Sequence, residues 1–467
     1  MSNAKYNVEP GFFSAGIIQL VLNYNFLRYG IWEPSKIDLR MTPLEILPDV
    51  KLLKNEVGFP LQNQEKSLVV GTVRMGYGHH RMAYALYTWG LKKYSQIYLH
   101  DLIGLGSKES DAIKDVDGFY SQMSRAASEM GGMIEWSWGM LMSQGGISSL
   151  HTSLAFAKRY VNLMGNISRD NPYISTYPLN GQIAVEAGVK KVIHLIPDNY
   201  PQYYLLVPGA LNLVQSPAAY LKFIEMGFPK ENLSIAGHWV SEKIGANSIF
   251  HSECRLERAE KKLKRRITLA IGGAGAQKNF TKSLLESLKE SLLKDKFQLF
   301  INTGDHSGLF HELKDHCKSI GIPFDEVTDR VSMETFLKDA ELSKMTDLNR
   351  KSLVFFHFED YFTAFSATDD LICVSDILMT KPSELAFFPI PKIFIRRVGD
   401  HEAASAFRSM ELGEGTMECR EVEHTVEMVN ILTGADDLFR RMCECIIRNS
   451  REGIYDGAKR AIEQALG

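Results

Sequence analysis

The stretch Ser67–Leu86, SLVVGTVRMGYGHHRMAYAL, decides the fold prediction for this chain. The apolar run Leu68–Val73 indicates a buried strand, and a glycine-rich turn follows it. The segment Met82–Tyr94 then carries apolar residues at helical spacing. Strand, glycine turn and helix in this order are typical of the first unit of an α/β domain. The start of such a helix favours anionic groups.

Strands and helices alternate along the rest of the chain, which predicts parallel sheets covered by helices on both faces. The expected strands of a first domain are Leu68–Val73, Ile97–Leu102, Lys191–Ile196, Leu211–Gln215 and Leu233–Ala236. Those of a second domain are Ile267–Ile271, Phe297–Ile301, Leu353–His357, Leu371–Val374 and Lys392–Ile395. The expected helices are Met82–Tyr94, Ile147–Leu163, Pro217–Met226, Phe280–Leu293 and Leu309–Ser319. The fold class is therefore α/β, with two doubly wound, Rossmann-like domains facing a cleft at the carboxyl ends of their strands.

The length of 467 residues also points to two domains, because it exceeds what one ordinary core accommodates. We expect an extension at 1–66, a first domain at 67–245, a basic linker at 246–266, a second domain at 267–435 and C-terminal helices at 436–467, the last of them near the first domain. The run Cys254–Arg266 holds seven basic and two acidic residues. This run fits either a solvated helix or a face for an anionic membrane. The charged segment Asp325–Arg350 is interpreted as an insertion.

The composition is that of a globular protein, with 45% hydrophobic and 23% charged residues and a net charge of −3. This charge gives no argument for nucleic acid as a partner. No apolar run approaches the roughly 20 residues that cross a bilayer. The uncharged segment Gly11–Leu27 leaves open a packed helix, a membrane-surface contact or a signal segment. The six cysteines form no CxxC pair or metal-ligand array, so we expect reduced thiols and a cytoplasmic protein without a metal site.

His79, which ends the glycine turn, is the first candidate for chemistry. A neutral imidazole at the start of a helix can accept a proton near pH 7. His80 is its competitor for this role, and a histidine that only caps the helix is the alternative interpretation.

A second glycine-rich stretch, Ile271–Gln277 (IGGAGAQ), follows the first expected strand of the second domain. Backbone N–H groups in such a loop can hold phosphate oxygens, or the loop can be only a tight turn. The glycines do not match GxGxxG, and no Walker lysine arrangement is present.

Two charged motifs follow later in the second domain. Glu384 lies in Asp376–Lys392 (DILMTKPSELAFFPIPK), between apolar segments where a carboxylate needs a partner. It could accept hydrogen bonds from two ribose hydroxyls, pair with Lys381 or stand at a helix start. The segment Arg396–Ala404 (RRVGDHEAA) places charges after a strand, where the arginines could meet phosphate or the loop could be solvated.

With these motifs in order, the chain resembles the GT-B glycosyltransferases. It is most similar to the family of monogalactosyldiacylglycerol synthase, the processive diacylglycerol glucosyltransferases and the lipid II-forming N-acetylglucosaminyltransferase. The similarity covers approximately residues 67 to 415. Gly76, Gly78 and His79 resemble that family's first loop, which ends in a functional histidine. Ile196–Asp198 resembles its strand that ends in an acid, and Leu213–Val240 resembles its approach to the interdomain linker.

The second-domain motifs resemble the family's donor site. The residues that the resemblance assigns to donor binding are Gly272, Gly273, Ala274 and Gly275 for the diphosphate, Ser383 and Glu384 for the ribose, and Arg396 and Glu402 near the leaving group and sugar. Two departures stand out. Lys381-Pro382-Ser383 replaces the glycine pair that usually precedes the acid, and Glu402-Ala403 replaces the usual paired glutamines.

The resemblance implies transfer of a sugar from a nucleotide sugar, with a UDP-sugar as the expected donor, to a hydroxyl acceptor. His79 would be the base, with Asp198 orienting it or sharing its role, and no metal or other cofactor is required. The segment Met130–Met142 is rich in Met and Trp, which suits a lipid acceptor and contact with the inner face of the membrane, although core packing also explains it. A nucleotide-sugar 2-epimerase and a non-catalytic nucleotide- or lipid-binding protein are the alternatives.

Overall fold

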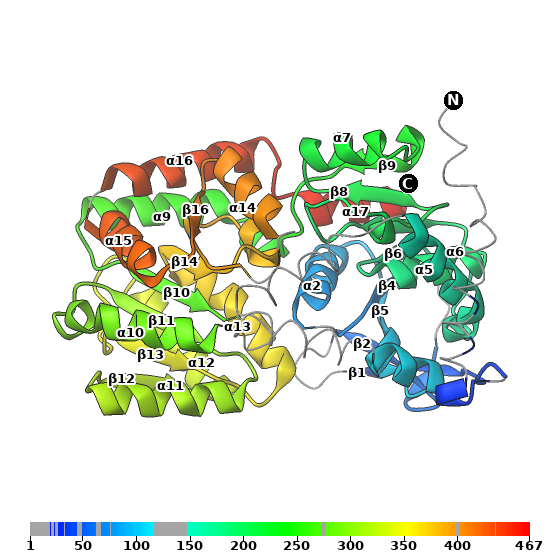
Figure 1. The fold of residues 1–467 in the computed structure, drawn as a ribbon, viewed down its shortest axis with the longest axis horizontal. Coiled ribbons are helices and arrows are strands. Elements are labelled where there is room, and N and C mark those ends of the chain that lie inside the picture. The colour runs from blue at the N-terminus through cyan, green and yellow to red at the C-terminus, as the bar shows by residue number, and fades with distance from the viewer. Residues whose placement is uncertain are drawn as a thin grey trace. The chain divides into compact units, whose positions relative to one another are not determined.

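A computed structural model of the chain describes residues 19, 23, 27–31, 33–43, 49–61, 67–74, 76–115, 147–271, 277–397, 399, 402–434 and 436–467. The described residues form two compact units (Figure 1). The first unit contains those up to Ser241 together with Asp456–Gly467, and the second contains Glu242–Tyr455. None of the described helices is long and apolar enough to cross a membrane. The segment Met130–Met142 and most of Gly11–Leu27 lie outside the described residues.

The first unit is built on sheet A, in which the described strands lie in the order β3-β1-β2-β5-β4-β6-β7-β8-β9. Their bounds are β1 Leu39–Pro43, β2 Lys51–Asn55, β3 Phe59–Pro60, β4 Ser67–Thr72, β5 Gln96–Asp101, β6 Tyr173–Ser175, β7 Val192–Leu195, β8 Leu211–Val214 and β9 Leu233–Ile235. Strand β1 is antiparallel to β2 and β3, and every other pairing is parallel. The segment before residue 67 therefore contributes strands to this sheet.

Helices cover both faces of sheet A. They are α2 Gly78–Gly90, α5 Ile147–Arg159, α6 Pro178–Glu186, α7 Pro217–Glu225 and α17 Gly457–Leu466. Successive side chains of a strand point to opposite faces. Val69 accordingly packs in one core with Ile183 of α6. Val70 packs in the other core with Leu86 of α2 and Ile462 of α17, so the last helix lies on the first unit as expected.

The second unit is built on sheet B, in which the described strands are all parallel and lie in the order β12-β13-β11-β10-β14-β15-β16. Their bounds are β10 Arg266–Ala270, β11 Gln298–Asn302, β12 Phe324–Val327, β13 Leu353–Phe356, β14 Ile377–Thr380, β15 Lys392–Ile395 and β16 Gly415–Cys419. The strand prediction for Leu371–Val374 is wrong, because these residues end helix α13 (Tyr361–Val374). A buried helix end and a buried strand show the same continuous apolar run.

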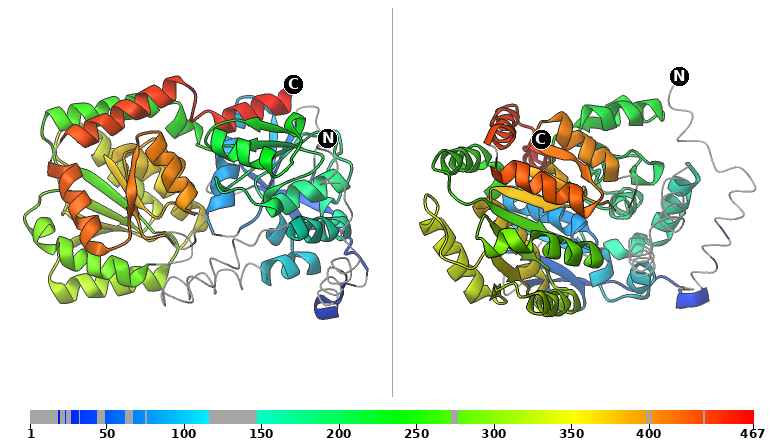
Figure 2. Two further views of the ribbon diagram at one scale, coloured as in Figure 1. Left: turned by 45° about the horizontal axis from the view of Figure 1, so that its top comes forward. Right: turned by 60° about the vertical axis from the view of Figure 1, so that its left-hand side comes forward.

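Helices also cover both faces of sheet B. Besides α13 they are α8 Glu242–Gly245, α9 Ser248–Glu260, α10 Lys278–Leu293, α11 Ser307–Ile320, α12 Arg330–Leu342, α14 Glu402–Glu411, α15 Val422–Gly434 and α16 Asp436–Arg451. Leu269 packs with Leu285 of α10 on one face. Phe300 packs with Phe336 of α12 on the other, ring centroids 5.3 Å apart. Helix α16 lies along α9 (Figure 2).

The interpretation of Asp325–Arg350 as an insertion is wrong. This segment contains most of the edge strand β12 and the whole of helix α12, so it is a regular strand–helix unit of sheet B. Asp329 caps α12 by accepting a hydrogen bond from the N–H of Ser332, in a capping box. The segment is charged because the edge strand β12 and one face of α12 are exposed to water. These exposed charges obscure the helical spacing of the buried apolar residues.

The arginines of the basic run Cys254–Arg266 match neither a solvated helix nor a membrane-facing surface. The run is the second half of α9 and the start of β10. Arg258 is buried and its guanidinium lies 3.1 Å from the Asp376 carboxylate. Arg255 is also buried and donates to three backbone carbonyl oxygens, those of Ile372, Ser375 and Pro389. These cations tie α9 to the ends of neighbouring elements inside the second unit.

Candidate functional site

Strand β4 occupies the point where the strand order of sheet A reverses. The chain continues from β4 to β5 on one side, and β6 later pairs with β4 on the other side. In open α/β sheets, ligands bind at such a point, outside the carboxyl ends of the strands. The candidate residues at this edge are Gly76, Gly78, His79, His80, Asp101, Thr176 and Asp198.

His79 is held at this edge by the residue that follows β6. Its Nδ1 lies 2.7 Å from the backbone carbonyl oxygen of Thr176. A carbonyl can only accept, so Nδ1 carries the proton and the neutral ring has its acceptor lone pair on Nε2. The ring of Tyr177 packs edge-on against the imidazole at 5.1 Å. This geometry suits a general base that acts through Nε2.

The turn before His79 and the residue that holds it are themselves fixed. Gly76 has φ of +68°, a left-handed conformation that favours glycine. The backbone N–H of Thr176 donates to the carbonyl of Gly71 at 2.9 Å, and its hydroxyl lies 3.1 Å from the hydroxyl of Thr72. Thr176 thus joins the ends of β4 and β6. Thr176 is not among the site residues predicted from sequence, because its place after the three-residue strand β6 is its only sequence signal.

His80, the competitor of His79, points into the protein. It is 5% exposed, and its Nε2 lies 3.4 Å from a carboxylate oxygen of Asp101. Asp101 ends β5, and its carboxylate accepts hydrogen bonds from the backbone N–H groups of Arg74 and Ile103. The edge therefore contains a buried histidine–carboxylate pair next in sequence to His79.

Asp198 lies in the segment after β7, and its neighbours on both sides are anchored. Three side chains donate the anchoring hydrogen bonds: Trp239 to the carbonyl of Ile196 at 3.0 Å, Gln215 to the carbonyl of Pro197 at 2.8 Å, and Ser216 to the side-chain oxygen of Asn199 at 2.5 Å. The Asp198 side chain is half-buried and has no hydrogen bond or ion pair with another described residue. The anchored segment leaves this carboxylate open to solvent or ligand.

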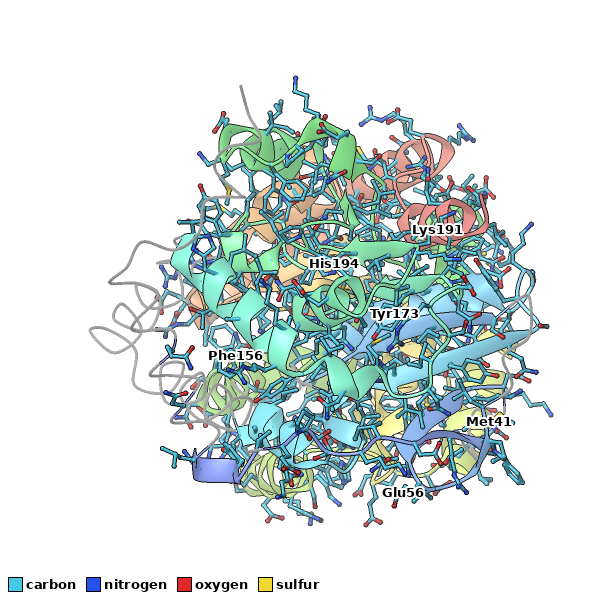
Figure 3. The ribbon with its side chains drawn as sticks, turned by 90° about the vertical axis from the view of Figure 1, so that its right-hand side faces the viewer. Met41, Glu56, Phe156, Tyr173, Lys191 and His194 are labelled. Carbon is cyan, nitrogen blue, oxygen red and sulfur yellow. The ribbon has the colours of Figure 1, made fainter. Side chains whose placement is uncertain are left out.

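Two further histidines lie in the interior of this unit. His194 is on β7, next to β6 and its Tyr173 (Figure 3). Its Nδ1 accepts from the Ser175 hydroxyl and its Nε2 donates to the carbonyl of Leu205, both at 2.9 Å. Burial lowers the pKa of His194 to about 3 and that of His100 to about 4. Both rings are therefore neutral at pH 7 and support the sheet rather than exchange protons.

Strand β10 has the corresponding position in sheet B. The chain continues to β11 on one side, and β14 later pairs with β10 on the other. The segment after β10 lies outside the described residues, and with it Gly272, Gly273, Ala274 and Gly275. Where the described chain resumes, Gln277 has φ of +73°, and its side-chain amide donates to the carbonyl of Arg396 after β15.

The segment after β14 carries Ser383 and Glu384. Glu384 begins the 3₁₀ turn Glu384–Phe387 and is half-buried. Neither side chain has a hydrogen bond or ion pair with another described residue. The alternative in which Glu384 pairs with Lys381 does not hold, because the Lys381 ammonium lies 2.5 Å from Glu402 instead. The Glu384 carboxylate thus remains open to solvent or ligand.

Glu402 and Arg397 are engaged with the protein. Glu402 is the first residue of α14, is 4% exposed, and also accepts from the N–H of Gly399 at 3.5 Å. The Arg397 guanidinium lies 2.5 Å from Glu418 of β16. Asp400 and His401 lie outside the described residues. In the described parts of the chain, no group of three or more His, Cys, Asp or Glu side chains could hold a metal ion.

Two parallel-sheet α/β units, each with polar side chains at its switch point, define a two-domain α/β protein with a GT-B-like fold. The chain belongs to the family described as "Domain of unknown function (DUF6938)", whose profile matches residues 228–466. A second profile, "Domain of unknown function (DUF6937)", matches residues 29–225. A search of curated proteins finds no match.

Two solved structures are similar to this chain at low sequence identity. A crystal structure from Listeria monocytogenes, assigned as a UDP-N-acetylglucosamine 2-epimerase, has a TM-score of 0.50 and 10% identity, over 85% of this chain and 95% of that one. The UDP-GlcNAc 2-epimerase from Neisseria meningitidis bound to UDP-GlcNAc has a TM-score of 0.47 and 11% identity, over 86% of this chain and 99% of that one. The likeness to the Listeria monocytogenes structure supports the GT-B-like fold and does not single out the lipid glycosyltransferases that the motifs resemble.

Proposed function

We propose that this protein is a nucleotide-sugar-dependent enzyme that transfers a sugar, from a UDP-sugar, to a hydroxyl acceptor. The observation that carries the proposal is the contact between His79 and Thr176 at the switch point of sheet A. It holds the proton on Nδ1, so that the neutral form of the ring has its acceptor lone pair on Nε2, as removal of a hydroxyl proton requires. Asp198, in its anchored segment, is proposed to orient the acceptor or to share the proton.

The donor is proposed to bind at the switch point of sheet B. The Glu384 carboxylate can accept hydrogen bonds from both ribose hydroxyls, and it has no competing partner among the described residues. Ser383 supplies a hydroxyl beside it. The segment Gly272–Gly275 and Arg396 are proposed to contact the diphosphate. A membrane lipid is one candidate acceptor and a water-soluble hydroxyl compound is the other.

In this reaction the acceptor oxygen attacks the anomeric carbon while its proton passes to Nε2 of His79. The bond between that carbon and the diphosphate oxygen breaks, and its electron pair leaves with UDP. Positive charge near the diphosphate offsets the charge that develops on the leaving group. No step requires a metal or an oxidant.

A 2-epimerase is the second candidate, and the buried pair of His80 and Asp101 favours it. Epimerisation removes a proton from one face of a carbon and returns one to the other face, so it needs two acid–base groups. His79 lies at this edge, and the buried His80–Asp101 pair, next to it in sequence, is proposed as the source of the second acid–base group. The similar structure from Listeria monocytogenes is assigned to this activity.

Incubation of the purified protein with a panel of radiolabelled UDP-sugars, with and without membrane lipid extract, tests both candidates. Label in the organic phase supports transfer to a lipid, and label on a water-soluble acceptor supports transfer without a lipid. An epimeric UDP-sugar formed without acceptor supports the epimerase. Nucleotide binding without turnover of any donor contradicts both and leaves a binding protein.

Glu384→Ala tests the donor site separately from the chemistry. Loss of hydrogen bonds to a charged acceptor should weaken UDP binding about 10- to 100-fold, measured by calorimetry. Glu290→Ala is the matched control, because Glu290 is an exposed carboxylate of α10 that pairs with Lys294. Equal UDP affinity in the wild type and in Glu384→Ala would remove Glu384 from the site.

A further inference from the structure

The ion pair of Lys381 and Glu402 stands at the switch point of sheet B, and the reaction described above does not use it. Lys381 directly follows β14, and its Nζ lies 2.5 Å from a carboxylate oxygen of Glu402. The Glu402 side chain is 5% exposed, whereas that of Lys381 is 23% exposed. Glu402 is therefore the inner member of the pair, and Lys381 has the more exposed side chain.

The strand order places Lys381 next to the carboxyl end of β10. Strand β14 pairs on one side with β10, which leads into residues 272–276, and on the other side with β15. The hydroxyl of Thr380, the last residue of β14, lies 3.4 Å from the carbonyl oxygen of Ala270, the last residue of β10. Lys381 is thus the next residue after a direct contact between the two strand ends.

The inner carboxylate would oppose an anionic ligand unless its charge were balanced. Two like charges in a partly desolvated site repel each other, whereas an ammonium between them attracts both. Glu402 is well held for this purpose, because it begins α14 and also accepts from the N–H of Gly399. The long lysine side chain is the adjustable partner of a fixed carboxylate.

We propose that Lys381 is the cationic contact for the diphosphate of the nucleotide sugar, and that Glu402 is a positioning residue that holds the ammonium in place. The inference rests on the proposed function. It assigns a role to Lys381, the first of the three residues that replace the usual glycine pair before Glu384. A lysine ammonium has three N–H donors, so it can keep its bond to Glu402 and donate to a phosphate oxygen.

The test compares the binding of UDP and of uridine to the full-length protein. Lys381→Met should weaken UDP binding about 10- to 100-fold, as expected for a lost hydrogen bond between charged groups. Binding of uridine, measured by ligand-observed NMR, should not change, because uridine has the base and ribose but no phosphate. Lys381→Arg keeps the charge and should lose less affinity for UDP. Lys294→Met removes an exposed lysine at the C-terminal end of α10. This variant should change neither UDP binding nor uridine binding.

Lys381→Met leaves the nearly buried Glu402 carboxylate without this partner, which can cost stability. The double variant Lys381→Met/Glu402→Gln removes both charges, and thermal unfolding establishes that each variant is folded. The double variant should bind UDP more weakly than the wild type does. Glu402→Gln alone should lose less UDP affinity than Lys381→Met, because it retains the ammonium.

The failures of the two proposals are distinguishable. Wild-type affinity for UDP in the double variant overturns the role of Lys381 and leaves the nucleotide site in place. An equal loss of UDP and uridine affinity in the folded variants also overturns it, because it indicates structural damage rather than a lost phosphate contact. Wild-type protein that binds neither UDP nor uridine overturns the proposed function itself.

Discussion

The Nδ1 atom of His79 lies 2.7 Å from the carbonyl oxygen of Thr176, although 97 residues separate them in the chain. The contact forms because β6 pairs with β4, which brings the residue after β6 beside the start of α2. It determines which nitrogen of the ring can accept a proton. The proposed chemistry depends on this one relationship more than on any other in the first unit.

His79→Asn tests whether His79 acts as a base, while it keeps the hydrogen bond to the carbonyl of Thr176. The asparagine amide can still donate to the carbonyl of Thr176 but cannot accept a proton as a base. Turnover should fall about 100-fold or more, in line with the loss of a general base. UDP affinity should stay unchanged, because Glu384 belongs to the other unit. His424→Asn, at an exposed position of α15, is the control, and full turnover by His79→Asn would exclude His79 as the base.

The two buried histidines of sheet A should make the protein less stable in mild acid. Burial lowers the pKa of His100 to about 4 and that of His194 to about 3, from about 6.5 in an unfolded chain. Between about pH 6.5 and pH 4 the unfolded chain binds one more proton per histidine. Stability should therefore fall as the pH falls through this window, by about 1.4 kcal/mol per pH unit for each histidine.

Urea unfolding across this pH window measures the effect. His194→Gln should make the slope of stability against pH shallower by about one proton. His424→Gln, at an exposed position of α15, is the control variant. A slope that is the same in wild type and His194→Gln would contradict the assignment.

Gly457, the first residue of α17, should not tolerate a side chain. A Cβ there would lie 2.4 Å from the carbonyl oxygen of Gly237 and 2.6 Å from that of His238. Both are backbone atoms, so Gly457→Ala should destabilise the protein by about 1–3 kcal/mol, as overpacking does. At Gly308 of α11, a Cβ would have no described atom from outside its own helix backbone within 4 Å. Gly308→Ala should therefore raise stability by about 0.5–1 kcal/mol. Calorimetric unfolding of the full chain measures the stability of both variants. A Gly457→Ala variant as stable as the wild type would contradict the prediction, because it would mean that the backbone at Gly237 and His238 moves to accommodate the methyl group.

Lys392 and Glu414 form an ion pair in which neither side chain is exposed. Their atoms are 2.8 Å apart, and burial lowers the pKa of Lys392 while the attraction of Glu414 opposes the change. Glu414→Gln leaves a buried ammonium without its counterion and should cost about 3–5 kcal/mol of stability. Lys392→Met/Glu414→Gln should recover part of this loss. Urea unfolding measures both variants, and a double variant less stable than Glu414→Gln would contradict the explanation.

The sequence by itself determined most of the sheet framework. The apolar runs Leu68–Val73 and Ile267–Ile271 overlap β4 and β10 closely, and Lys392–Ile395 coincides with β15. Strands of a parallel sheet are buried on both faces, so each reads as a short continuous apolar run that needs no partner to be recognised. The alternation of these runs with helical periods then predicted two doubly wound units. These strands and helices can be predicted locally, because the pattern of apolar residues that identifies each one lies within its own sequence.

Only the tertiary structure decided which side chains meet. It showed that Lys381 pairs with Glu402 rather than Glu384, and that Thr176 holds His79. It also showed that Arg255 is buried among carbonyl groups rather than solvated. Each of these contacts joins residues that are apart in sequence and that strand order brings together. A charged residue looks the same in sequence whether it meets water, a counterion or a carbonyl, and the fold alone decides among them.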